Sequence, residues 1–370
     1  MYKAVAMTAI TGKHMIEKNY NRVIFFILLF FAFVLGGMLC MYMSSFIIPI
    51  IVALMLSFVF LPIIKKINSK TKIPWTVSTI IVILLFLVMF IGVSSLLVSG
   101  FRSIINEYPK YESKFLNVYK VVASRFNLEF EEGKSFITNL WNNLEVQKYA
   151  QKAAVFLSSG VASFGKSFFL IVVMMIFIEF EVNLTKEKMK TAFISKNETF
   201  MKICRQVMND TVRYVSIKFY ISLATGILVF FSTWIIGMNF PIVWAFIAFI
   251  MNFIPVFGSI ISVGTTTLFA VLQFSPEFAK PIFILIFLTT INMLLGNILE
   301  PRIEGKNLGL SPFAIIVSLS LWGYIWGFIG MILAVPLTVI IKIICENIED
   351  LKWLGIILGN GSSNSKQSDK

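Results

Sequence analysis

Residues with the chemistry to bind an ion or a hydroxylated solute form a stripe in an otherwise apolar stretch: Thr289, Asn292, Gly296 and Glu300. Their 3-4-4 spacing places them on one face of an α-helix, with Asn297 beside them. Carboxylates and amides at membrane depth are costly unless paired or hydrated, so they concentrate at pathways and helix contacts. Glu300 is therefore a candidate ligand for a cation or a proton, and the two asparagines are candidate contacts for an ion or for solute hydroxyls. The structural alternative is hydrogen bonding between helices.

A second polar break, NFIPVFG from Asn252 to Gly258, interrupts the 33 apolar-rich residues at 241–273. As one straight helix this run would be about 50 Å long, more than one crossing needs. Proline and glycine at the break favour two shorter segments that meet at an elbow, as a hairpin or as a discontinuous helix. Broken helices often hold a ligand with their freed backbone groups, so Asn252 joins the candidate site. Alternatively, Pro255 and Gly258 only shape the bend.

The run from 312 to 346 repeats this interruption, with Gly323, Gly327 and Gly330 at its centre. Glycines at 4-3 spacing share one side of a helix and allow another segment to approach closely. Gly327 and Gly330 are therefore candidate hinge or packing residues, with no predicted chemistry of their own.

An ordinary span at 281–300 lies between the two breaks and ends at Pro301, with Gly305 in the following loop. Pro301 and Gly305 complete the set of candidate hinge residues. Glu300 would then stand at the end of a helix between two broken segments. In the structural alternative, Arg302 pairs with Glu300 or with Glu304.

The composition places these elements in a membrane. Hydrophobic residues make up 58% of the 370 residues and the mean hydropathy is +0.85, so the chain has more apolar surface than soluble cores of this size could bury. The 32 Lys and Arg behind the net charge of +13 are dispersed among the loops, as lipid head groups favour, and no nucleic acid partner is indicated. We predict an all-α, polytopic integral membrane protein in contact with the lipid bilayer.

Few groups are available for catalysis or metal binding. The single histidine, His14, lies in the polar N-terminal arm, which excludes Ser-His-Asp triads and HExxH sites. Cys40, Cys204 and Cys345 are far apart and have no CxxC partner, so no zinc site or disulfide framework is indicated. We therefore predict no enzymatic activity, no metal and no cofactor. Because no GxxxxGK[ST] motif is present, active transport would have to use an ion gradient.

Apolar runs long enough to cross roughly 30 Å of hydrocarbon lie at 23–43, 45–64, 75–101, 154–180 and 215–237. Together with the span at 281–300 and the two broken or re-entrant segments, they predict about eight membrane segments. Glu179 marks the expected inner boundary of the fourth run. Lys218, near the start of the fifth, is expected to snorkel to the inner surface.

Loop charges set the predicted orientation. The 65–72 loop carries four lysines and no acidic residue, so it is expected in the cytoplasm together with both termini. The connection after the third span then lies outside, and its apolar residues at 4-3 spacing between 104 and 122 predict a small helical extramembrane insert.

The predicted organisation has seven parts. They are a cytoplasmic N-terminal arm at 1–22, the first three transmembrane helices at 23–101, an extracellular helical insert at 102–152, a fourth transmembrane helix at 153–181, a cytoplasmic amphipathic linker at 182–213, a C-terminal transport core with the broken segments at 214–347, and a cytoplasmic tail at 348–370.

Three ordered blocks resemble the autoinducer-2 exporter (AI-2E) family of bacterial and archaeal membrane proteins: NFIPVFGSIIS at 252–262, GNILEPRIEGKNLGLSP at 296–312 and WGFIGMILAVPLTVIIK at 326–342. The blocks cover the C-terminal half, and the arrangement of the N-terminal half is also similar. Ser311 departs from the family pattern, because many relatives place a histidine there, and this argues against a histidine proton carrier.

The resemblance implies a permease-like protein of the bacterial inner membrane, whose relatives are linked to export of signalling molecules, to Na⁺ or Li⁺/H⁺ antiport and, in spore-formers, to sporulation. We therefore expect a homo-oligomeric transporter for a small polar solute, such as a signalling molecule, or for a monovalent cation. The competing hypothesis is a non-transporting membrane scaffold, for example in sporulation, that recruits a partner through the extramembrane insert.

Overall fold

The computed structural model describes residues 24, 27–28, 30–125, 167–181, 198–304 and 309–359. Within these ranges the regular elements are helices, and the only pairing of β type is an isolated bridge between Leu310 and Gly359. The predicted all-α fold class is therefore confirmed.

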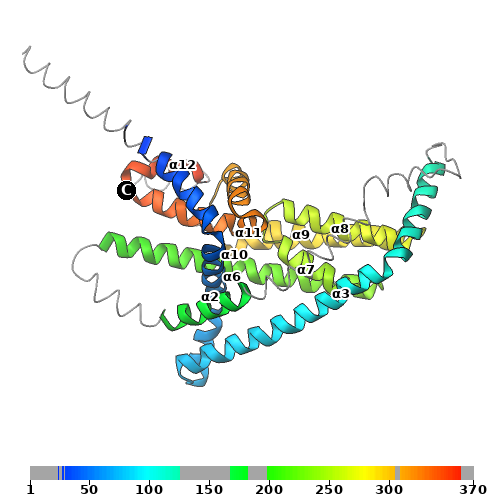
Figure 1. Ribbon diagram of the computed structural model, residues 1–370, viewed down its shortest axis with the longest axis horizontal. Helices are drawn as coiled ribbons and strands as arrows, with labels where there is room; N and C mark the ends of the chain where they lie inside the picture. The colour runs from blue at the N-terminus through cyan, green and yellow to red at the C-terminus, as the bar shows by residue number, and fades with distance from the viewer. Residues whose placement is uncertain are drawn as a thin grey trace, which may run out of the picture.

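The helices follow one another along the chain as Figure 1 shows. Two helices without labels lie at Phe30–Tyr42 and at residues 167–181. The labelled elements are α2 (Ser44–Thr71), α3 (Trp75–Arg125), α6 (Glu198–Ile235), α7 (Pro241–Met251), α8 (Phe257–Phe274), α9 (Ala279–Asn292), the π-helix η1 (Met293–Leu299), α10 (Glu300–Glu304), α11 (Pro312–Asn347), the 3₁₀ turn η2 (Glu349–Leu351) and α12 (Lys352–Leu358).

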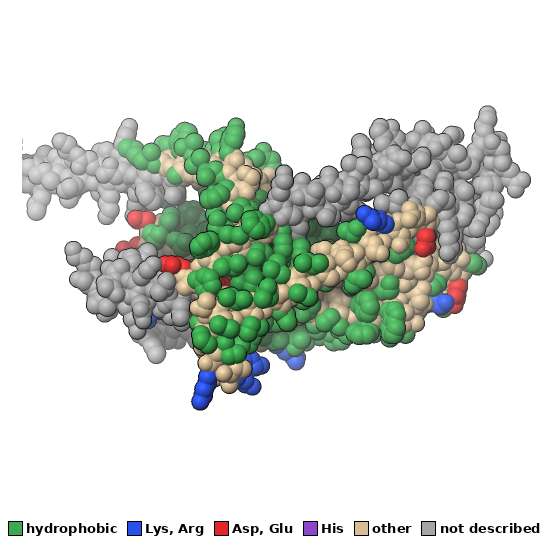
Figure 2. Space-filling view, turned by 60° about the horizontal axis from the view of Figure 1, so that its bottom comes forward, with side chains coloured by type: hydrophobic (Ala, Val, Ile, Leu, Met, Phe, Trp, Pro, Cys, Tyr) green, Lys and Arg blue, Asp and Glu red, His purple; other side chains and the backbone are tan. Residues whose placement is uncertain are grey.

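Long apolar helices dominate the described part of the chain. Six are long and apolar enough to cross a membrane, namely Ser44–Thr71, Trp75–Ile104, Ile203–Ile235, Phe257–Phe274, Ala279–Ile303 and Pro312–Asn347. Figure 2 shows hydrophobic side chains over much of one face, with Lys and Arg toward its margins. An apolar outer surface of this extent fits lipid and not water, and the prediction of a polytopic membrane protein is confirmed.

Two helices continue beyond the spans predicted for them. The third span and the first part of the predicted 102–152 insert form one helix, α3, of 51 residues. Residues 198–213, the second half of the predicted 182–213 linker, run without a break into α6. The remainder of both predicted parts, at 126–152 and 182–197, lies outside the described residues, as do residues 1–22.

The first broken segment is a helical hairpin made of α7 and α8. The Trp244 and Phe269 rings lie 4.9 Å apart, so the start of α7 packs beside the end of α8. At the elbow, a Cβ added to Gly258 would lie 1.7 Å from the Met251 carbonyl oxygen. Only glycine allows this approach, and of the two predicted alternatives the hairpin is the one found.

The second broken segment, α11, also doubles back. Its backbone leaves helical geometry at Gly327, which has φ 61° and ψ −138°. The Ser318 hydroxyl donates to the Ala334 carbonyl at 2.9 Å, so the two arms lie side by side. A Cβ on Gly330 would lie 1.9 Å from the Trp322 carbonyl oxygen. Gly327 is therefore the tip of a hairpin and Gly330 its closest packing point.

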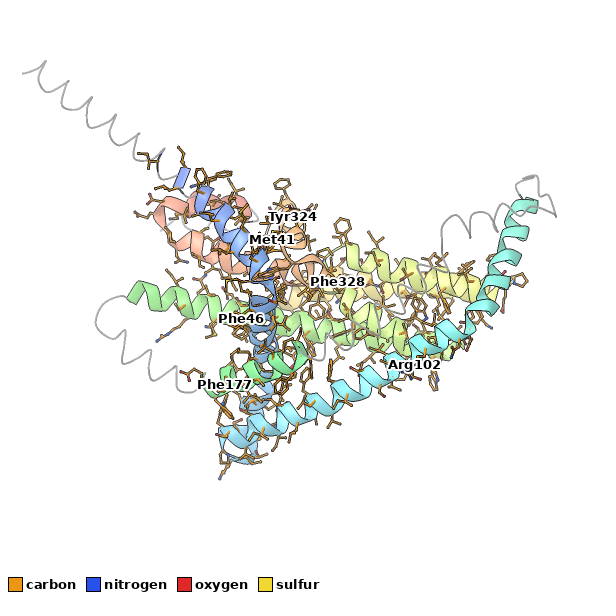
Figure 3. All side chains as sticks on the ribbon, viewed as in Figure 1. Met41, Phe46, Arg102, Phe177, Tyr324 and Phe328 are labelled. Atoms are coloured by element: carbon orange, nitrogen blue, oxygen red, sulfur yellow. The ribbon has the colours of Figure 1, made fainter. Side chains whose placement is uncertain are left out.

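The tip of the α11 hairpin reaches the helix Phe30–Tyr42. The Trp326 indole donates to the Cys40 carbonyl at 2.9 Å. Figure 3 correspondingly places Met41 beside the tip residues Tyr324 and Phe328. The second hairpin is thereby anchored to the N-terminal helices.

Helix α6 connects the two halves of the core. One core cluster joins α2, α3, the helix at 167–181, α6 and α11, and a second joins α6, α7, α8 and α9. Gly226 brings α6 against α7, because a Cβ there would lie 3.1 Å from the Ala245 carbonyl oxygen. Helix α6 therefore packs against both broken segments, the α7–α8 hairpin and α11.

Candidate functional site

A buried ion pair links α6 to the start of α10. The Lys218 ammonium lies 2.6 Å from Glu300 Oε1, and the two side chains are 7% and 12% exposed. Lys218 does not extend to the surface, so the prediction that it snorkels is wrong: Glu300 of a neighbouring helix holds its ammonium inside the protein. The pairing of Glu300 with Arg302 is not found either, because Arg302 is exposed and Glu300 contacts Lys218.

The π-helix η1 turns Glu300 toward α6. On α9 the buried residues Ile284, Leu288 and Ile291 follow 4-3 spacing, which in a continuous α-helix would next bury positions 295 and 298 or 299. The wider turns of a π-helix shift this register. Leu299 is accordingly 41% exposed, while Glu300 takes the inward position.

The same register shift divides the predicted polar stripe. Thr289 is exposed, and its hydroxyl donates to the Leu285 carbonyl of its own helix at 2.7 Å. Asn292 is half-buried and donates to the Leu288 carbonyl at 2.9 Å. Asn297 is exposed. The prediction of one continuous polar face is therefore wrong, since only Glu300 reaches α6.

Asn252 is the second predicted residue that α6 holds. Its amide donates to the Ser222 hydroxyl at 2.9 Å, and both side chains are buried. Ser222 follows Lys218 by four residues, so their contacts lie on one face of α6 and about 6 Å apart along its axis. The structure thus brings Asn252 and Glu300 together at one helix. The 4-residue spacing of Lys218 and Ser222 was the available signal, and sequence reasoning missed it.

The elbow between α7 and α8 positions Asn252. Asn252 ends α7, and its backbone N–H donates to the Ala248 carbonyl at 3.0 Å. Pro255 follows, and Val256 adopts a left-handed φ of 64° before α8 begins. Pro255 and Gly258 therefore shape the turn, and Asn252 is the elbow residue whose side chain makes the polar contact to α6.

A further contact fixes the other end of α10. The Arg213 guanidinium donates to the Ile303 carbonyl at 2.9 Å. A cationic donor at a helix C-terminus satisfies a carbonyl that the helix leaves unpaired. Pro301 is exposed at the start of this short helix, and Gly305 lies outside the described residues.

The arrangement is suited to exchanging polar partners. A buried ion pair is stable only while both charges are present, because removal of one leaves the other desolvated. A polar solute or cation that contacts Glu300 would have to compete with Lys218. Among the described residues, no cluster of three or more His, Cys, Asp or Glu could hold a metal ion.

Two helical hairpins beside a buried polar contact site define a class: polytopic membrane transporters built around broken helices. The chain belongs to the AI-2E transporter family, because the sequence model of that family matches residues 23–350. The resemblance seen in the sequence is thereby confirmed. The protein is a multi-pass membrane transporter.

Individual relatives agree with this assignment. A Borreliella burgdorferi protein with the provisional name of a transport protein is 31% identical over 257 residues, 69% of each chain. A Haemophilus influenzae protein, also provisionally named a transport protein, is 29% identical over 322 residues, 86% of this chain and 91% of the relative. TqsA of Escherichia coli K12, named an AI-2 transport protein, is 26% identical over 324 residues, 86% of this chain and 90% of the relative.

Proposed function

We propose that this transporter moves a small polar solute with hydroxyl groups, such as a signalling molecule, across the bacterial inner membrane. The observation that carries the proposal is the buried Lys218–Glu300 pair, one helical turn from the Ser222–Asn252 hydrogen bond. Ammonium, carboxylate and amide groups together offer donors and acceptors to a hydroxylated ligand.

In this mechanism the ion pair closes the empty site. Entry of the solute separates Lys218 from Glu300, and hydroxyl groups of the solute take over part of their hydrogen bonding. The α7–α8 elbow carries Asn252 against α6, so movement of this hairpin would make or break the third contact. Homo-oligomerisation and cytoplasmic termini remain parts of the proposal.

Na⁺(Li⁺)/H⁺ antiport is the second candidate, and the same pair favours it. A Na⁺ or Li⁺ ion bound to Glu300 would displace the Lys218 ammonium from its carboxylate. If the displaced ammonium gives up one proton to the opposite side, one cation exchanges for one proton and the charge of the site is unchanged.

Flux in proteoliposomes tests both candidates. One assay follows an internal pH dye after addition of Na⁺ or Li⁺, and the other follows a radiolabelled hydroxylated signalling molecule. We expect Glu300→Gln and Asn252→Ala to lower flux at least about tenfold, corresponding to roughly 1.4 kcal/mol. Thr289→Val is the matched control, because Thr289 is exposed and bonded within its own helix.

Equal flux in Glu300→Gln and the unaltered protein would overturn the role of the ion pair. Absence of both fluxes, together with capture of a partner by residues 102–152, would instead favour the non-transporting scaffold.

A further inference from the structure

Glu179 is a buried carboxylate outside the Lys218–Glu300 site. It is 1% exposed, and neither carboxylate oxygen has a hydrogen-bond partner in the described part of the chain. An isolated ionised carboxylate in an apolar core is too costly to persist. The group therefore requires either a proton or a bound cation. The sequence placed Glu179 at the inner boundary of its span and did not predict that its side chain is buried there.

Buried hydroxyl groups on α2 and α3 also lack hydrogen-bond partners among the described residues. The Ser57 hydroxyl of α2 is near enough to stabilise the Glu179 carboxylate, although it makes no well-formed hydrogen bond to it. On α3, Ser78 and Thr79 are 0% exposed and their hydroxyls lack partners among the described residues. Three unsatisfied hydroxyls thus accompany one unsatisfied carboxylate.

Contacts between α3 and the helix at 167–181 place these groups near one another. The Trp75 indole donates to the Glu179 backbone carbonyl at 3.1 Å, and the Phe90 ring stacks on Phe168 with centroids 3.7 Å apart. The two helices therefore run antiparallel. Ser78 and Thr79 follow Trp75 by one turn, about 5–6 Å along α3, and so lie beside the turn that precedes Glu179.

We propose that Glu179 is the anionic ligand of an internal site for Na⁺ or Li⁺, completed by the Ser57 hydroxyl and by Ser78 or Thr79. Small hard cations prefer carboxylate and hydroxyl oxygens. One carboxylate balances one positive charge, whereas a divalent ion would leave an unpaired charge in the core. Lys65 is the cationic group that acts on Glu179 through space, and it is exposed.

This site does not depend on the proposed solute, because it shares no residue with the Lys218–Glu300 pair or with Asn252. A cation bound here would tie α2, α3 and the helix at 167–181 together. The carboxylate and hydroxyl oxygens would gain the partners that they otherwise lack.

Binding of radioactive sodium to the full-length protein in detergent tests the site. In a Glu300→Gln background, which removes the cation ligand proposed for antiport, we expect saturable binding that Glu179→Gln abolishes and that Ser57→Ala weakens by about tenfold, through loss of one oxygen ligand. Glu181→Gln is the matched control, because Glu181 lies two residues away on the same helix and is exposed.

Thermal unfolding supplies a second measurement. NaCl or LiCl should raise the unfolding temperature of the unaltered protein relative to choline chloride at equal ionic strength, and should not do so in Glu179→Gln. In choline, Glu179→Gln should unfold at or above the temperature of the unaltered protein, which shows that the variant folds.

Unchanged sodium binding in Glu179→Gln would overturn the site. A stability that responds to pH but not to Na⁺ or Li⁺ would overturn it as well, since Glu179 would then simply hold a proton. If the unaltered protein binds sodium but moves no solute in proteoliposomes, the proposed function is contradicted and the sodium site at Glu179 is not.

Discussion

At the scale of single residues, Lys218 and Glu300 stabilise each other only as a pair. Removing one partner of a buried ion pair costs about 3–5 kcal/mol, whereas replacing both with apolar residues is often neutral. We expect Lys218→Met and Glu300→Leu each to lower the free energy of unfolding by that amount. The double variant should regain most of the loss. Denaturant unfolding in detergent measures the cycle, and strictly additive losses would show that the two charges do not interact.

Residue type alone identified Glu300 and Asn252, because a carboxylate and an amide stand out in apolar runs. It did not identify their partners. Lys218 and Glu300 are 82 positions apart, and such a pairing depends on how α6 packs. The burial of Glu179 was missed for a related reason: hydropathy locates the end of an apolar run, but burial at that end is decided by the neighbouring helices.

At the scale of elements, the π-helix η1 determines which residue faces Lys218. Deleting Gly296 would remove the additional residue, and in the continuous α-helix that results Glu300 would take position 299, which the spacing of the buried residues on α9 places toward α6. We therefore expect the deletion variant to keep the Lys218–Glu300 pair, to transport, and to avoid the loss of roughly 3–5 kcal/mol expected for Glu300→Leu.

Gly296→Ala is the control for this deletion, because nothing lies within 4 Å of the added Cβ. It should transport and unfold like the unaltered protein. A deletion variant that loses the ion pair and transport while Gly296→Ala keeps both would contradict this account of the register. Sequence spacing did not reveal η1, since a 3.6-residue period was assumed throughout the span.

The α7–α8 hairpin depends on one glycine. A Cβ on Gly258 would lie 1.7 Å from the backbone oxygen of Met251, so Gly258→Ala must open the elbow. We expect a loss of about 1–3 kcal/mol in stability, as for other overpacked sites, with reduced transport as Asn252 moves from Ser222. Unfolding and flux assays measure the two effects.

Gly264→Ala on the same helix is the matched control, because no atom lies within 4 Å of its added Cβ. Equal stability of the two variants would contradict a tight elbow. The hairpins themselves were predictable, since Pro and Gly interrupt runs too long for one crossing. The choice of hairpin over bent span was not, because it depends on contacts between the arms.

At the scale of the whole molecule, contacts between helix ends agree with the alternating direction of the predicted spans. At one end, Trp75 contacts the Glu179 backbone and Arg213 contacts the Ile303 backbone. At the other, Asn239 contacts Glu107 and Gln273. Loop charges predicted the first group inside and the second outside, so residues expected on one side of the membrane meet one another.

These contacts lead to a prediction about orientation. The turn between α8 and α9 lies at the end of the molecule where Asn239 contacts Gln273. The C-terminus of α2 lies at the opposite end, where Trp75 contacts the Glu179 backbone. In a background without Cys40, Cys204 and Cys345, a cysteine at Glu277 should react with an impermeant maleimide in intact cells. A cysteine at Lys66 should react only after the membrane is opened. Both positions are exposed, so accessibility within the protein is not limiting.

The labelling pattern also tests the hairpins at the level of the whole chain. If α7 and α8 form a hairpin that does not cross, α6 must end and α9 must begin on the same side, so cysteines at Asn239 and Glu277 should share one reactivity. Reaction from opposite sides would require the α7–α8 segment to cross the membrane as one unit. That outcome would contradict the packing of Trp244 on Phe269, because a single extended span separates the two rings.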